Sequence, residues 1–302
     1  MPRIALVTAR AARGLDDDIP LLEAALRRIE VDFLTVDWDD ASVDWSQFQI
    51  AVLRSTWDYA TRFTEFLTWA DRVAKLTTLI NPPSVVRWNV DKHYLLDLSN
   101  VGIPVIPSEF IEPGSPAEPA LAAFLTKHHS KEFVVKPAVG AGSRDVFRFG
   151  SEEAGAAAAH AQRLLTENRS VLLQPYLERV DAEGETALLY FDGVFSHAIR
   201  KGPMLQREQR EVQGLFKAEH ITPRRAGDDE LSLGEQVRAA IPFRDLLYAR
   251  IDMIRDSSGE PRVLELELTE PSVFLDHDLE AADRFAQRIR ARTLPFFDRR
   301  SS

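Results

Sequence analysis

Two patterns of apolar and polar positions alternate over the first eighty residues. Residues 4–7, 31–36 and 50–53 are short runs dominated by apolar side chains, which predict strands. An amphipathic helix is predicted between the first two runs, because apolar residues recur there at steps of three or four: Leu15, Ile19, Leu22, Leu26 and Ile29. The pattern at residues 61–76 predicts a second helix. Strands separated by helices indicate parallel β-α-β units, so we expect residues 1–88 to form an N-terminal α/β domain.

The pattern changes after Asn81-Pro82-Pro83-Ser84, a sequence typical of a chain break. The later strands fall in two groups, with an alanine-rich helix between them, and the last two are long. They are predicted at residues 132–136, 146–149, 171–174, 186–191 and 194–200. Asp192-Gly193 is a hairpin dipeptide between the last two strands. We therefore predict a central subdomain over residues 89–176 and a C-terminal subdomain over residues 177–302, giving a fold of mixed α/β and α+β class.

Composition and charge narrow the classes of function. The chain has 302 residues with 37 Lys and Arg against 47 Asp and Glu, a net charge of -10, which disfavours a nucleic-acid partner. No run approaches the roughly 20 apolar residues that span a bilayer, so no membrane partner is expected. The absence of cysteine excludes disulfides, thiolate metal sites and a cysteine nucleophile. These features indicate a cytoplasmic protein.

The most informative charges lie on two predicted strands near the end of the chain. Leucines alternate with Glu265 and Glu267, so both glutamates point to one face of a strand. Closing a hairpin on the loop at residues 257–260 gives these cross-strand pairs: Ile254 with Val263, Asp252 with Glu265, and Arg250 with Glu267.

This register places Asp252 directly opposite Glu265. Like charges in that position destabilise a strand pair unless a cation lies between them. Carboxylate oxygens suit magnesium or manganese, so a metal site is one explanation. A solvated face with an Arg250–Glu267 ion pair explains the same residues equally well.

Two lysines and a glycine-rich loop suggest a phosphate site. Lys136 ends a predicted strand and is followed by Gly140 and Gly142. Glycines allow backbone N–H groups to approach a phosphate, and a lysine neutralises it. The lysine precedes the glycines, so this is not a Walker A loop, and an ordinary turn explains it as well. Lys92 lies at the start of a predicted helix, where a surface lysine is the default explanation.

Two loops are candidates for the substrate. Residues 53–59 follow a buried parallel strand, and ligands bind at the carboxyl ends of such strands. Arg54 is expected to hold a carboxylate, with Trp57 or Tyr59 as a pocket wall; an exposed loop with packed aromatic residues is the alternative. The loop at residues 269–272, which contains Ser272, is the second candidate.

The order of these parts resembles the ATP-grasp superfamily of ligases over nearly the whole chain. That order is a lysine at a helix start, a strand ending in Lys-Pro with a glycine-rich loop, Gln-Pro-Tyr-Leu, a Gly-Glu-Thr strand, an Arg-x-Asp strand and a Glu-x-Glu strand. The resemblance implies an ATP-grasp fold, in which the N-terminal domain is followed by two subdomains that clasp ATP.

The resemblance also implies positions for ATP. Its phosphates would contact Lys92, Lys136 and Lys217, under a loop formed by Gly140, Ala141, Gly142 and Ser143. Its adenine would lie beside Gln174, Tyr176 and Leu177, and its ribose near Glu185.

By the same resemblance, Asp252, Glu265 and Glu267 would bind two magnesium ions, with manganese as an alternative. Many family members have Glu-x-Asn where this chain has Glu265-Leu266-Glu267, which makes the third ligand charged. ATP-grasp enzymes usually transfer the γ-phosphate to a carboxylate and let an amine attack the acyl phosphate. Arg250 would stabilise the charge on the acyl oxygen.

Three blocks resemble one branch of the family, the O-ureido-D-serine cyclo-ligases of antibiotic biosynthesis: residues 54–59, 87–92 and 265–272. This resemblance implies an ADP-forming carbon–nitrogen ligase that closes a small amino-acid-like substrate, O-ureido-D-serine, to D-cycloserine. An intermolecular ligase of the dipeptide or D-alanine type and a non-catalytic nucleotide-binding module are the alternatives. A homodimer is compatible with the sequence, which does not fix the oligomeric state.

Overall fold

The N-terminal unit is built on a parallel sheet, as the alternation of strands and helices predicts. We describe the protein from a computed structural model, which covers residues 3–205, 215 and 220–293. The sheet has the order β2-β1-β3-β4, with the bounds β1 Ile4–Thr8, β2 Phe33–Asp37, β3 Ile50–Leu53 and β4 Thr78–Ile80. The strand β4 has only three residues and was not predicted from the sequence.

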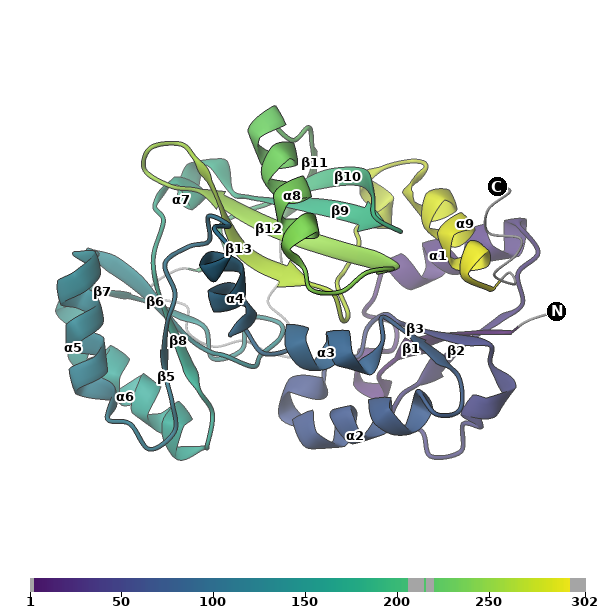
Figure 1. Ribbon diagram of the computed structural model, residues 1–302, viewed down its shortest axis with the longest axis horizontal. Coiled ribbons are helices and arrows are strands. Elements are labelled where there is room, and N and C mark those ends of the chain that lie inside the picture. The colour runs from purple at the N-terminus through teal and green to yellow at the C-terminus, as the bar shows by residue number, and fades with distance from the viewer. Residues whose placement is uncertain (1–2, 206–214, 216–219, 294–302) are drawn as a thin grey trace.

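Both faces of this sheet are covered, which explains its apolar strands. Ile4 and Leu6 of β1 pack in a core that includes residues of α1 (Asp18–Arg28) and α9 (Ala281–Thr293). Ala5 and Val7 point to the other face, where α2 (Phe63–Val73) and several tryptophans pack. Figure 1 shows α9 beside α1 at the right of the molecule, so the end of the described chain returns to the first domain.

The central unit is a four-stranded antiparallel sheet of the order β5-β8-β6-β7. Its strands are β5 Glu109–Ile111, β6 Glu132–Pro137, β7 Phe147–Gly150 and β8 Val171–Pro175. The helices α5 (Ala117–His128) and α6 (Ala154–Thr166) share one core with these strands and lie at the left of Figure 1. The short helix α7 (Arg179–Glu183) then leads into the third unit.

The C-terminal unit is a five-stranded antiparallel sheet of the order β11-β10-β9-β12-β13. Its strands are β9 Glu185–Phe191, β10 Val194–Lys201, β11 Ile221–Arg224, β12 Tyr248–Arg255 and β13 Pro261–Glu267. One core joins this sheet to the helices α3 (Pro83–Asn89), α4 (Tyr94–Asn100) and α8 (Asp228–Ala240). The predicted boundary at residue 88 therefore falls within α3, near its end, and α3 packs on the same sheet as α4. This boundary and the one at residue 176 stay predictions.

The helix predicted around Lys92 is displaced in the structure. Lys92 lies in the turn between α3 and α4 and begins neither helix. The side chain of Asn89, the last residue of α3, donates to Leu266 O at 2.7 Å and accepts from Leu268 N at 2.6 Å. These bonds fasten the turn to the C-terminal sheet and bring Lys92 toward the strand that carries the glutamates.

The register predicted for the β12–β13 hairpin is confirmed at its two charged pairs. It is wrong nearer the tip, where Ile254 pairs with Arg262 and not with Val263. A β-bulge gives β13 one extra residue, Leu264, between the two registers. Because the bulge breaks the strict alternation, Val263 is buried in the sheet core and Leu264 faces the other side.

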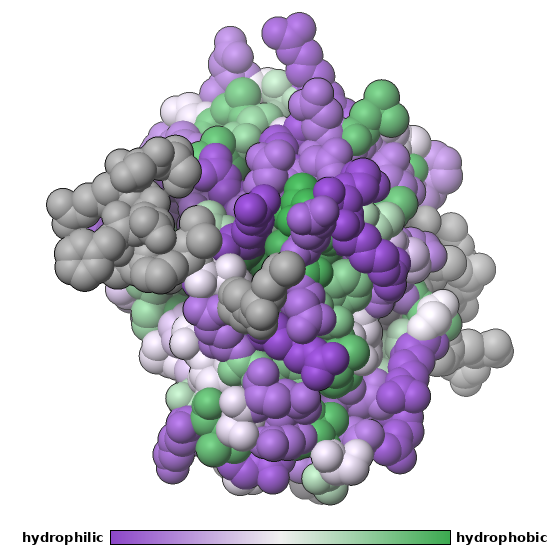
Figure 2. Space-filling view, turned by 90° about the vertical axis from the view of Figure 1, so that its right-hand side faces the viewer, coloured by the Kyte–Doolittle hydropathy of each residue, from purple (hydrophilic) through white to green (hydrophobic). Residues whose placement is uncertain are grey.

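No helix among the described residues is long and apolar enough to cross a membrane. On the face shown in Figure 2, hydrophobic residues form small patches separated by hydrophilic ones. That surface is typical of a protein whose large apolar faces are used in its internal cores.

Candidate active site

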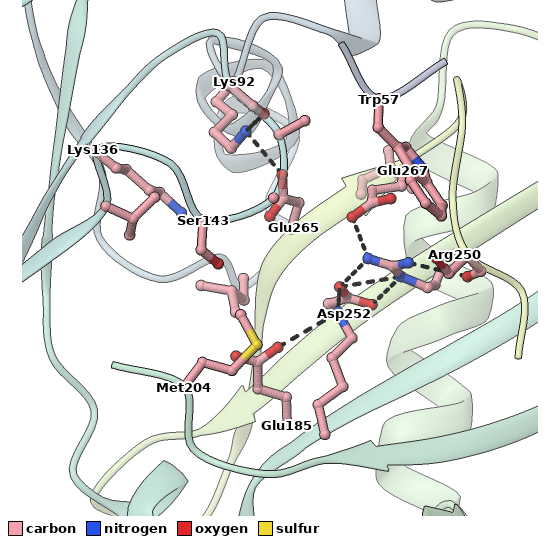
Figure 3. A pocket seen from close by; sticks show the side chains of 18 of the residues that line it. Trp57, Lys92, Lys136, Ser143, Glu185, Met204, Arg250, Asp252, Glu265 and Glu267 are labelled. Atoms are coloured by element: carbon pink, nitrogen blue, oxygen red, sulfur yellow. Dashed lines mark hydrogen bonds and ion pairs between the residues drawn. The ribbon is translucent and has the colours of Figure 1, made fainter. Parts of the chain in front are cut away.

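A cavity of about 540 Å³ lies where the three units meet. Figure 3 shows Lys136 and Ser143 across the cavity from Arg250. Among the residues that the structure describes, all predicted site residues except Arg54 line it: Trp57, Tyr59, Lys92, Lys136, Gly140, Ala141, Gly142, Ser143, Gln174, Tyr176, Leu177, Glu185, Arg250, Asp252, Glu265, Glu267 and Ser272. Lys217 lies outside the described residues. The structure thus brings the set together, and the role of each residue stays a prediction.

Two buried lysines form one wall of the cavity. Lys92 N donates to Ala138 O at 3.0 Å, which fixes the α3–α4 turn beside the end of β6. Its Nζ lies 2.9 Å from Glu265 Oε1 and 3.2 Å from Gly140 O. Lys136 is 6% exposed, and burial, with repulsion from Lys92, lowers its pKa to about 8 against the attraction of Glu265. No hydrogen-bond acceptor of Lys136 Nζ is found within the described part of the chain, so the ammonium is available to an anion.

The glycine-rich loop lies next to these lysines and lines the cavity. Gly142 has φ +65°, a conformation that glycine adopts without strain. A Cβ on Gly140 would come within 3.1 Å of Pro137 Cγ, so a larger residue there would press the loop away from β6. The loop therefore depends on glycine at both positions to run close to the cavity.

The opposite wall is an ionic network centred on Arg250. Its Nε donates to Asp252 Oδ1 at 2.9 Å, and the same guanidinium donates to Glu267 and, at 3.1 Å, to Ser272 O. Burial raises the pKa of Glu267 to about 7, reinforced by Glu265 and Asp252 and opposed by Arg250. Burial also acts to raise the pKa of Asp252, but the positive charges of Arg250 and Lys201 outweigh burial and lower that pKa.

Lys201 completes this network and was missed by the sequence analysis. It is 4% exposed, and its Nζ lies 2.5 Å from Asp252 Oδ2 and 3.8 Å from Glu185 Oε2. Counting outward from the Asp192-Gly193 turn without interruption would place Arg200 opposite Glu185. A β-bulge between Phe195 and His197 shifts the register, so Lys201 takes that place.

The three predicted metal ligands share a wall but do not converge. Within the described residues, no three side chains of metal-ligating type come together as a cation site. Asp252, Glu265 and Glu267 are each held by a lysine or arginine instead. Their donor set is all oxygen, which fits magnesium or manganese. The pKa of Glu267 is raised first by burial and then by the nearby carboxylates of Glu265 and Asp252, and a bound cation would offset both effects.

The end of the cavity near Gln174 is largely apolar. Leu264, directed there by the bulge in β13, and Ile254 line it together with Ile106, Val134 and Met204. Gln174 is 2% exposed and donates to Ser108 Oγ at 2.9 Å. Strict alternation along β13 would have placed Leu264 in the sheet core, which is why this lining residue was not found from the sequence.

Arg54 does not reach the cavity, contrary to the expectation that it holds a substrate carboxylate there. It is 1% exposed and donates to Pro271 O at 2.7 Å. Its guanidinium also lies over the rings of Tyr248 and Phe285, at 5.5 and 5.4 Å from their centroids. The carbonyl and the rings stabilise the buried charge, so Arg54 supports the loop behind the cavity wall.

Glu270 is a second lining residue that was not singled out from the sequence. It is 8% exposed, and the Tyr59 hydroxyl hydrogen-bonds to its carboxyl group. Trp57 Nε1 donates to the backbone carbonyl of Glu270 at 3.1 Å. Burial, with repulsion from Glu267, raises the pKa of Glu270 to about 8.

This raised pKa predicts a pH-dependent effect of Glu270→Gln on stability. The folded protein binds the Glu270 proton up to about pH 8, whereas the unfolded chain releases it near pH 4.5. The stabilisation from the protonated carboxyl is therefore present below pH 4.5 and is lost as the pH rises toward 8. We expect the Tm of the variant minus that of the wild type to increase between pH 5 and pH 8. The control Glu260→Gln changes an exposed glutamate and should show a constant difference; a constant difference for Glu270→Gln would contradict the prediction.

Comparison with known proteins agrees with this geometry. Residues 4–81 match the family model "D-cycloserine synthetase DcsG, N-terminal domain", and residues 108–277 match "Prokaryotic glutathione synthetase, ATP-grasp domain". The cycloserine biosynthesis protein DcsG of Streptomyces lavendulae is 41% identical, over 97% of this chain and 99% of that protein.

Two solved structures are similar over nearly the whole chain. The crystal structure of D-cycloserine synthetase DcsG has a TM-score of 0.90 at 40% identity, covering 97% of this chain and 100% of that one. The ATP-grasp ligase PsnB, complexed with a phosphomimetic variant of its minimal precursor, Mg and ADP, has a TM-score of 0.65 at 17% identity and covers 96% and 98%. The second likeness shows the fold alone.

Fold and site together define an ATP-grasp ligase, and the expectation of an ATP-dependent, ADP-forming enzyme is confirmed. Its N-terminal unit does not match the glutathione synthetase model, which begins at residue 108. The chain belongs to the family of D-cycloserine synthetase DcsG.

Proposed function

We propose that this ligase closes a ring within one small amino-acid-like molecule, converting O-ureido-D-serine to D-cycloserine. The observation that carries the proposal is the likeness to a cycloserine biosynthesis protein at 41% identity over 97% of the chain, the N-terminal unit included. That unit supplies Trp57 and Tyr59 to the cavity, at the side where a substrate would lie beside ATP.

The first step would transfer the γ-phosphate of ATP to the substrate carboxylate. A carboxylate oxygen attacks the γ-phosphorus and ADP leaves. The phosphates would be held by Lys92, Lys136 and the loop at residues 140–143. Lys136 supports this assignment, because its Nζ has no hydrogen-bond acceptor among the described residues. The apolar end of the cavity, with Ile254 and Leu264, would take the adenine.

The second step would close the ring. The nitrogen bonded to the side-chain oxygen loses its proton and attacks the acyl carbon, and phosphate leaves, which gives a ring that still carries the carbamoyl group. Reaction of this group with water would release it as carbon dioxide and ammonia and leave D-cycloserine. Arg250 would donate hydrogen bonds to the acyl oxygen as negative charge develops on it. Glu270 and Ser272, both in the loop at residues 269–272, line the cavity and would contact the substrate.

Asp252, Glu265 and Glu267 would hold the divalent cations that accompany ATP, two magnesium ions by the family resemblance, with manganese as an alternative. When bound, the cations supply charge neutralisation to the phosphates. The basic partners of these carboxylates would then turn toward the phosphates. Lys201 is the best placed of them, since it lies between Asp252 and Glu185.

Mass spectrometry of the products tests the proposal. With ATP, Mg²⁺ and O-ureido-D-serine, we expect ADP and a cyclic product derived from a single substrate molecule. A panel of other amino acids, alone and in pairs, should release much less ADP. The L-enantiomer is included in the panel, because its ADP release relative to that of the D-enantiomer gives the stereochemical preference.

Each alternative gives a different result in the same assay. An intermolecular ligase would release ADP with pairs of amino acids and give a dipeptide mass, which would reject ring closure. A non-catalytic nucleotide-binding module would bind ATP but release no ADP with any acid. Ring closure is favoured over both, because the chain covers 99% of a cycloserine biosynthesis protein and keeps every predicted carboxylate at the cavity.

A further inference from the structure

The loop that follows β13 carries several residues of the cavity wall, among them Ser272 and Phe274. Ser272 O accepts from Arg250 at 3.1 Å. The ring of Phe274 lies under the same guanidinium, with 5.6 Å between its centroid and Arg250 Cζ. Phe274 has φ +50° and ψ +51°, a left-handed conformation that is unusual for a residue other than glycine. The loop therefore contributes to the orientation of Arg250, beside the carboxylates of Asp252 and Glu267.

Arg54 and Trp57 bind carbonyl groups of this loop, and one carboxylate of the N-terminal unit binds its backbone N–H groups. Asp18, at the start of α1, is 5% exposed. Its Oδ2 accepts from Val273 N at 2.6 Å and from Phe274 N at 3.2 Å, and its Oδ1 accepts from Leu275 N at 2.7 Å. Three consecutive N–H groups thus converge on one side chain, 255 or more residues away in sequence.

These contacts require an anionic acceptor with two oxygens. A carboxylate accepts hydrogen bonds only, so both of its oxygens can face N–H groups. An asparagine would present one oxygen and one NH₂ group, and the NH₂ group would oppose at least one of the three N–H donors. Hydrogen bonds to a charged acceptor are also stronger than those to a neutral one.

We propose that Asp18 is a positioning residue for Arg250: it fixes the backbone at residues 273–275 and thereby sets the Ser272 carbonyl and the Phe274 ring against the guanidinium. The chemical role of Arg250 rests on the proposed function, whereas the structural link from Asp18 to Arg250 does not. The link joins the N-terminal unit, which carries the candidate substrate loop at residues 53–59, to the centre of the ionic network.

Kinetics of Asp18→Asn test the catalytic part of the proposal. We expect kcat for ring closure to fall about 10- to 100-fold, the size of effect that misplacing a reacting group produces, with the KM for ATP within about twofold of the wild type. Arg250→Lys should lower kcat as well, and adding Asp18→Asn to it should lower kcat little further, because both act through one guanidinium. The control is Asp283→Asn, which removes an exposed carboxylate that also contacts α1, through Arg28. It should leave kcat unchanged.

Nuclear magnetic resonance tests the structural part independently of turnover. The Arg250 Nε–H signal, assigned by its loss in Arg250→Lys, should shift or broaden in Asp18→Asn and stay in place in Asp283→Asn. An unchanged signal would overturn the proposal, and so would effects of Asp18→Asn and Arg250→Lys on kcat that multiply. If the wild type made no cyclic product, the proposed function would fail while the spectra still decided whether Asp18 positions Arg250.

Discussion

Glu265→Gln should reduce ADP release by at least about 100-fold at physiological Mg²⁺. Mutating groups that merely orient a metal ligand typically costs 10- to 100-fold, so removing a charged ligand should cost more. Glu265 is the best candidate in the network for an anionic metal ligand. Burial acts to raise its pKa, but the positive charges of Lys92 and Lys136 outweigh burial and lower that pKa to about 2. Steady-state ADP release measured over a wide range of Mg²⁺ concentrations checks this, and part of the loss should be recovered at high Mg²⁺.

Glu260→Gln is the matched control, because Glu260 is an exposed glutamate at the tip of the same hairpin. It should leave the Mg²⁺ dependence unchanged. Thermal unfolding of both variants separates catalysis from stability, since Glu265→Gln also removes the carboxylate partner of Lys92. If Glu265→Gln kept wild-type turnover and the same Mg²⁺ dependence, Glu265 would not be a metal ligand.

The N-terminal fold was predictable because its signals are local. Ile4–Thr8 and Ile50–Leu53 are continuous apolar runs, and a parallel sheet buried on both faces requires such runs. The helix α1, which follows Ile4–Thr8, has a clear period, so its type was predicted correctly and only its first turn was misplaced. Thr78–Ile80 is too short to show any period, and it forms a strand because β3 lies beside it.

The site was predictable where strict alternation holds and not where it breaks. Asp252 and Glu265 lie opposite each other as the hairpin register predicts. Toward the tip of that hairpin, a bulge in β13 turns Leu264 into the cavity. A second bulge, in β10, places Lys201 opposite Glu185. A bulge inserts one residue without a distinctive sequence signature in these strands, so strict alternation places the side chains beyond it on the wrong face.

Contacts between distant segments were the second limit. Arg54 follows a parallel strand, where a ligand-binding role is a reasonable expectation. Its actual partner, the carbonyl of Pro271, is 217 residues away. Asp18 is fixed in the same way by backbone groups 255 to 257 residues away. Such partners follow from the packing of one unit on another, which periodicity along the chain does not encode.

Lys136→Met should weaken ATP binding severely while leaving the nucleotide-free fold intact. Truncating one partner of a buried, hydrogen-bonded charge pair costs about 2–5 kcal/mol, or roughly 30- to several-thousand-fold in Kd. Lys136 is 6% exposed, so its contact with a phosphate would be little screened by solvent. Without nucleotide, Lys136→Met should raise the Tm, because a buried ammonium with no described acceptor destabilises the fold of the wild type. Calorimetric titration with ATP and thermal unfolding without it measure the two effects.

The pH dependence distinguishes a direct contact from a general loss of structure. The pKa of Lys136 is lowered to about 8 without ligand, and a bound phosphate would raise it. ATP binding by the wild type should therefore take up a proton above pH 8 and weaken as the pH rises further, whereas Lys136→Met should lose this dependence. The control Lys127→Met removes an exposed lysine that pairs with Glu109 in the same unit, and it should bind ATP as the wild type does. If Lys136→Met bound ATP normally, or lost affinity only together with Tm, Lys136 would not contact the phosphates.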